Sequence, residues 1–128
     1  MNPQREKNAR ELWQILTADL ASAGVRVEQD AWRVELTRLS RSCTVFCLDY
    51  DRADKGRSIG PAYNVKFYAD GVIQSVGRTK DLDQVRGAVR DWVANTATRE
   101  ELSVRHPFAI YRDDFAAFGH TILDEDVG

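Results

Sequence analysis

The sequence lacks any long apolar run. It has no stretch of about 18 consecutive apolar residues, which is near the minimum for a membrane-spanning helix. Residues 1–10 are mostly polar, so no secretory signal peptide is readable. We therefore expect a cytoplasmic protein with no membrane partner.

Cysteine is also scarce. The two cysteines, Cys43 and Cys47, fall within one predicted strand. At about 3.3 Å per residue their Cα atoms would lie about 13 Å apart, whereas a disulfide needs them within roughly 7 Å. Two thiols without a nearby histidine also fall short of the ligand set of a structural zinc site. Both are therefore predicted to be buried apolar residues, and neither a metal nor a cofactor is expected.

Neither sign of charge is in large excess. The chain has 18 Lys and Arg against 20 Asp and Glu, which gives a net charge of −2. Without a general basic field, nucleic acid is a disfavoured partner.

The length and composition indicate one globular domain. The chain has 128 residues, of which 43% are hydrophobic and 30% are charged. This is enough for one ordinary core. No repeat or linker divides the chain, so residues 1–128 are predicted to form a single domain. Residues 124–128 are expected to form a disordered acidic tail.

Apolar spacing predicts two main helices. Residues 3–23 carry an apolar stripe at helical spacing, and Gly24 follows as the residue just beyond the helix end. Asp81 stands where the N-cap of a second helix belongs, and this helix is predicted to end near Asn95. We interpret Trp13, Trp32 and Trp92, together with Phe46, Phe67 and Phe108, as core residues in apolar stripes.

A third, short helix is predicted further along. Thr98 and Glu101 have the spacing of a capping box, and the helix should end before Pro107. Residues 108–123 contain several aromatic and aliphatic side chains, so they are expected to fold back onto the domain as a strand or a helical turn.

Alternating apolar residues predict strands between the two main helices. Residues 32–37 alternate, whereas residues 42–50 are apolar on both faces. Asp70-Gly71 separates two further strands as a hairpin turn. The predicted fold is therefore α+β with two layers, in which an antiparallel sheet of four to five strands packs against an N-terminal and a C-terminal helix.

Residues 51–61 are predicted to form a charged, glycine-containing loop. Its residues Arg52, Asp54, Lys55 and Arg57 are candidates for binding an anion or the charged patch of a partner protein. No glycine-rich phosphate-binding motif is present, and a solvated loop would account for the same residues.

Three residues are candidates for acid or base chemistry. Asp49 and Asp51 would point to one side of a strand end, and His120 lies near several carboxylates in sequence. A structural interpretation competes with each of these, because aspartates satisfy turn backbone groups and a histidine can simply lie on the surface. No hydrolase or metalloprotease motif occurs, so the sequence leans against an enzyme without excluding one.

The later part of the chain carries a family resemblance. It rests on Asp81-Leu82-Asp83-Gln84-Val85, Ala88-Val89, Trp92-Val93, Glu101-Leu102 and Pro107-Phe108. These residues resemble a family of small actinobacterial proteins labelled natural product biosynthesis proteins. The resemblance implies a cytosolic accessory protein and supplies no catalytic residues. The order of elements is also similar to that of secretion chaperones and of immunity proteins that neutralise toxins.

Two functions follow as expectations. The first is a non-catalytic binding or accessory protein, immunity-like or chaperone-like, that recognises a protein partner or small ligand through a sheet face and the 51–61 loop. The alternative is a small enzyme or ligand carrier in natural product biosynthesis. An edge strand would also permit a homodimer, although no residue demands one.

Overall fold

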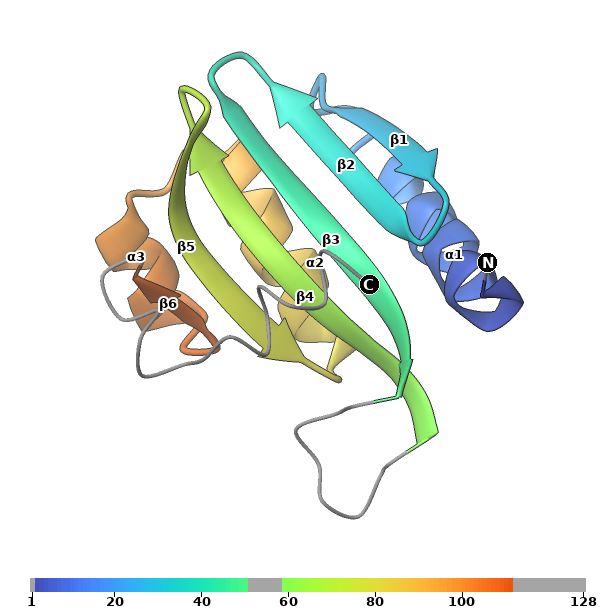
Figure 1. The fold of residues 1–128 in the computed structure, drawn as a ribbon. Coiled ribbons are helices and arrows are strands. Elements are labelled where there is room, and N and C mark those ends of the chain that lie inside the picture. The colour runs from blue at the N-terminus through green and yellow to red at the C-terminus, as the bar shows by residue number, and fades with distance from the viewer. Residues whose placement is uncertain (1, 51–58, 112–128) are drawn as a thin grey trace.

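A sheet of six antiparallel strands, with helices packed on one of its faces, makes up the fold (Figure 1). The computed structural model describes residues 2–50 and 59–111. The elements are α1 (Pro3–Asp19), β1 (Arg26–Asp30), β2 (Arg33–Arg38), β3 (Arg41–Tyr50), β4 (Ile59–Ala69), β5 (Val72–Thr79), α2 (Leu82–Val89), the π-helical turn η1 (Arg90–Ala94), α3 (Arg99–Arg105) and β6 (Ala109–Tyr111).

The strands lie in the sheet in the same order as in the sequence. The predicted α+β, two-layer architecture is confirmed, with six strands rather than four to five. The additional strands are the short ones at the two edges, β1 and β6. In β1 only Val27 is apolar, and β6 has only three residues, so neither has a clear alternating pattern.

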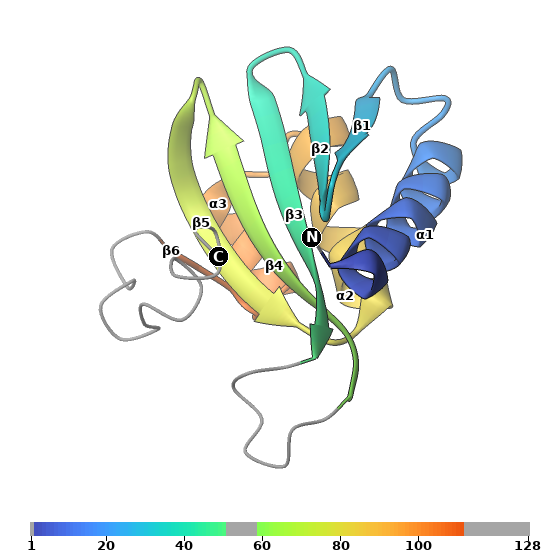
Figure 2. The same cartoon turned by 45° about the vertical axis from the view of Figure 1, so that its right-hand side comes forward.

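The helices share one side of the sheet. α1 contacts β1, β2 and β3, η1 contacts β2 and β3, and α2 contacts β5. Figure 2 shows α1 and α2 on the same side of the strands. Within residues 2–50 and 59–111, no helix is long and apolar enough to cross a bilayer.

The core lies between the sheet and these helices. The helices contribute Leu12 and Leu16 from α1, Val89 from α2 and Trp92 from η1, which pack against the strands. The rings of Phe67 and Trp92 meet edge to face at 6.0 Å. From the strands, the core takes Val34, Leu36, Cys43, Val45, Cys47, Tyr63, Val65 and Phe67.

The cysteine prediction is confirmed. Cys43 and Cys47 are fully buried and unpaired with each other. Burial raises the pKa of both thiols, so they remain protonated and act as apolar core residues.

Short sequence patterns correctly predicted one hairpin turn and the starts of two helices. Asp70 and Gly71 have φ of 52° and 78°, the left-handed conformation that a two-residue hairpin turn requires. Asp81 caps α2 by accepting a hydrogen bond from the Asp83 N–H. Thr98 and Glu101 form both hydrogen bonds of the predicted capping box.

Three details differ from the sequence prediction. α1 ends at Asp19 rather than Ala23, because the chain turns before Gly24, whose φ is +73°. β4 begins at Ile59, so residues 59–61 of the predicted 51–61 loop belong to a strand, and residues 51–58 lie outside the described part of the chain. Trp32 lies in the turn between β1 and β2 rather than in the helix-side core, and its ring lies 5.4 Å from that of Phe46.

Candidate functional site

The sheet face opposite the helices, here called the helix-free face, is the main candidate surface. None of the described helices packs on it (Figures 1 and 2). Paired strand residues project to the same side, so the strand register defines this face. It consists of Arg26, Glu28, Asp30, Arg33, Glu35, Thr37, Ser42, Thr44, Phe46, Leu48, Ala62, Asn64, Lys66, Tyr68, Val76 and Arg78.

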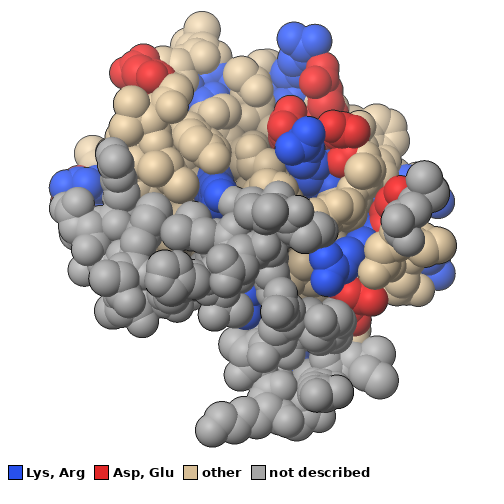
Figure 3. Space-filling model, in the orientation of Figure 1, with Lys and Arg blue, Asp and Glu red and all other residues tan. Residues whose placement is uncertain are grey.

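Its β1–β2 side carries paired charges of both signs. Arg33 lies 2.8 Å from Asp30 and 3.8 Å from Glu35, and Arg26 lies 2.6 Å from Glu28. These side chains are largely exposed, so each pair adds little to stability. Figure 3 shows charged side chains gathered over β1 and β2, where they are available to a partner.

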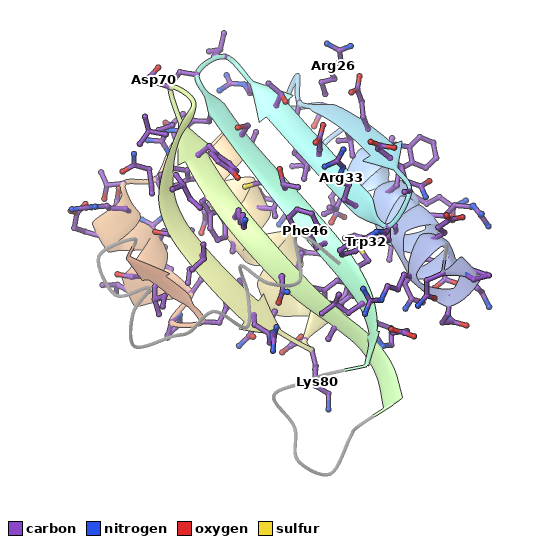
Figure 4. The ribbon with its side chains drawn as sticks, in the orientation of Figure 1. Arg26, Trp32, Arg33, Phe46, Asp70 and Lys80 are labelled. Atoms are coloured by element: carbon purple, nitrogen blue, oxygen red, sulfur yellow. The ribbon has the colours of Figure 1, made fainter. Side chains whose placement is uncertain are left out.

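An aromatic group lies next to these charges. The rings of Trp32 and Phe46 are tilted against each other, and the Arg5 guanidinium lies 5.1 Å from the Trp32 ring. Figure 4 places Trp32, Arg33 and Phe46 close together on the face turned to the viewer. Phe46 is buried, whereas Trp32 is only half-buried and Arg33 is exposed. The face therefore presents an aromatic side chain and a guanidinium side by side.

The centre of the face is buried and mixes polar side chains with the apolar Leu48, Ala62 and Val76, so the accessible part of the face lies around it. Asn64 is fully buried and accepts a hydrogen bond of 2.8 Å from Arg78 Nε. The Lys66 ammonium lies 5.7 Å from the Phe46 ring, and burial lowers the pKa of Lys66. Lys66 is therefore less strongly held in its charged form than an exposed lysine.

A shallow depression of about 260 Å³ lies toward the β2–β3 turn. Ser42, Thr44 and Tyr68 line it with hydroxyl groups, and Glu35 adds a carboxylate. Burial, together with the nearby Glu35 and Cys43, raises the pKa of Tyr68, so its hydroxyl stays protonated. The depression can therefore donate and accept hydrogen bonds.

Asp49, a candidate acid or base, holds α1 against β3. Its carboxylate accepts hydrogen bonds from Arg5 Nε at 3.0 Å and from Asn2 Nδ2 at 3.4 Å. Burial opposes ionisation, but these hydrogen bonds outweigh it and lower the pKa of Asp49. Asp51 and His120 lie outside the described residues, as do the loop candidates Arg52, Asp54, Lys55 and Arg57.

The structure brings together one pair that the sequence did not suggest. His106 Nε2 lies 2.7 Å from Asp91 Oδ2, and Asn95 donates to the other carboxylate oxygen at 3.0 Å. Burial disfavours the charged carboxylate, but these hydrogen bonds lower the pKa of Asp91. The pair joins η1 to the end of α3. It has no local sequence signal, because its members are far apart along the chain.

No cluster of three metal-ligating side chains occurs in the part of the chain that the structure describes. Comparison of the chain with protein-family models, with curated proteins and with solved structures finds no match. The resemblance of residues 81–108 to natural product biosynthesis proteins therefore stays a prediction.

Proposed function

We propose that this chain is a non-catalytic, cytoplasmic binding protein that recognises a protein partner through the helix-free face. The observation that carries the proposal is the presence of Trp32, Arg33 and Tyr68 as accessible side chains on or beside this face. A few residues carry most of the binding energy at protein interfaces, and tryptophan, arginine and tyrosine are enriched among them. An immunity-like or chaperone-like protein would use a face of this kind.

The charge pairs around Arg33 also favour a protein partner. Both signs of charge occur along β1 and β2, so a partner with mixed charges could exchange ion pairs with them. Such pairs contribute more to specificity and association rate than to stability. We include the 51–61 segment in the proposed surface because it joins β3 to β4, the two central strands.

Catalysis has weaker support. Of the three acid or base candidates, Asp49 has a lowered rather than a raised pKa and is engaged by Arg5 and Asn2. A general acid working near neutral pH would need the opposite shift. A ligand carrier is the second candidate function, and it is favoured by a separate cavity beside Arg41.

The test is affinity capture with two variants of the helix-free face and one control variant. The tagged protein would be compared with Arg33→Glu, Tyr68→Ala and the control Arg10→Glu, an exposed residue of α1 on the other side of the molecule. We expect a stoichiometric protein partner with the wild type and the control. Binding should weaken at least about tenfold in each face variant, as for interface hot spots.

Thermal unfolding of each variant would separate lost binding from lost folding. Arg52→Ala, Lys55→Ala and Arg57→Ala together would test the loop as a separate part of the surface. A partner held equally well by both face variants would rule out the helix-free face as the binding site.

A further inference from the structure

A cavity of about 480 Å³ lies where the start of β3, the β4–β5 hairpin and the start of α3 meet. It opens widely to solvent, so a ligand of small-molecule size would stay partly exposed in it. Asp70, labelled in Figure 4, lies at the hairpin turn on its rim. The cavity is separate from the depression on the helix-free face.

Arg41 is held rigidly in this cavity. The centre of its guanidinium lies 3.9 Å from the centroid of the Trp92 ring. Nη1 donates to the carbonyl oxygen of Ala97 at 2.7 Å and to that of Trp92 at 3.3 Å. The contact with the Trp92 ring and the two hydrogen bonds restrain the guanidinium together. Its geometry is therefore fixed before any ligand arrives.

One edge of the Arg41 guanidinium keeps its donors. Among the described residues, all hydrogen bonds of the Arg41 side chain come from Nη1, and Nε and Nη2 have no acceptor. The N–H groups of Nε and Nη2 point in parallel along the same edge, which is the arrangement that receives both oxygens of a carboxylate.

The surrounding charges favour a monoanion. Arg41 and Arg99 supply two positive charges, and Asp70 and Glu100 supply two negative charges. Both carboxylates repel any anion, but they repel a phosphate dianion more strongly than a carboxylate, whose single charge Arg41 can balance. Val72, which is 48% exposed, lines the same cavity and offers an apolar surface there.

We propose that this cavity binds a small organic acid, with its carboxylate on the Nε and Nη2 edge of Arg41 and its apolar part against Val72. The assignment is independent of the proposed protein-binding function, since it uses neither Arg33 nor Tyr68. It also gives Arg41 a role beyond joining β3 to η1.

The test is a titration followed by NMR, with benzoate as the probe. Benzamide, its neutral counterpart, and inorganic phosphate are the comparison probes. We expect benzoate to cause saturable shifts of the Arg41 Nε–H signal and of backbone signals at residues 69–74 and 98–100. Benzamide should cause none, and phosphate should bind more weakly than benzoate.

Two substitutions and a control sharpen the test. Arg41→Lys keeps the charge but removes the two-donor edge, so benzoate binding should weaken at least about tenfold. Glu100→Gln removes a repulsive carboxylate, so binding should tighten by about two- to fivefold. Glu11→Gln on α1 is the distant control and should change nothing.

The gain expected for Glu100→Gln cannot arise from misfolding, so the proposal stays testable even if Arg41→Lys is unstable. The proposal would be overturned by the absence of saturable shifts at tens of millimolar benzoate. It would also be overturned by equal binding of benzoate and benzamide.

Discussion

The two faces of the sheet use the same strands for different purposes. On the helix-covered face, β2 and β3 contribute Val34, Val45 and Cys47, all of which are fully buried. On the helix-free face the neighbouring positions carry Arg33, Glu35 and Thr44, which are exposed or half-buried. One face therefore provides stability, which leaves the accessible polar part of the other free to serve recognition.

The largest expected difference between the faces concerns their tryptophans. Trp92→Ala should cost about 3–5 kcal/mol of unfolding free energy, because it removes a fully buried ring. It also removes the 2.9 Å hydrogen bond that Trp92 Nε1 donates to the backbone carbonyl oxygen of Tyr68. Trp32→Ala should cost about 1 kcal/mol, because the ring is half-buried and packs mainly on Phe46. Urea unfolding measures both, and equal losses would contradict the contrast.

A smaller difference is expected between two aspartate–arginine pairs. Asp49 and Arg5 are 27% and 15% exposed, whereas Asp30 and Arg33 are 67% and 44% exposed. Asp49→Asn should lower the unfolding free energy by about 1 kcal/mol at pH 7. Asp30→Asn should have almost no effect, because surface pairs contribute little.

The Asp49 effect should depend on pH in a defined direction. The folded-state pKa lies below the usual value of 3.8, so the carboxylate stabilises the fold fully above that value. The stabilisation is lost as the pH falls through the folded-state pKa. Unfolding curves of the wild type and Asp49→Asn should therefore converge well below pH 3.8, and a difference that persisted there would show another cause.

A further expected effect, no larger than that of Asp49→Asn, has the opposite sign. Ser75 pairs with Phe67 on the helix-covered face, and its hydroxyl is fully buried with no hydrogen-bond partner among the described residues. Ser75→Ala should raise the unfolding free energy by about 1 kcal/mol, since it removes an unsatisfied polar group. The matched Ser42→Ala on the helix-free face should leave it unchanged. Thermal unfolding distinguishes the two, and a destabilised Ser75→Ala would reveal a hidden partner.

The sequence by itself determined those features that depend on neighbours along the chain. The hairpin at Asp70-Gly71 follows from the left-handed conformations its turn needs, and the start of α3 follows from the hydrogen bonds between Thr98 and Glu101. The alternating apolar residues of β2 also indicated that Val34 and Leu36 would enter the core. Each of these signals spans only a few residues.

Only the tertiary structure decided that β1 pairs with β2 and β6 with β5 at the two edges of the sheet. It also decided the position of Trp32 and the partners of Asp49. The same holds for the His106–Asp91 pair and for Arg41, whose contact with Ala97 joins residues 56 positions apart. Such contacts form when the sheet brings distant segments together, and their energy depends on burial and geometry that no local pattern encodes. The strands could therefore be found from the sequence, whereas the candidate sites between them could not.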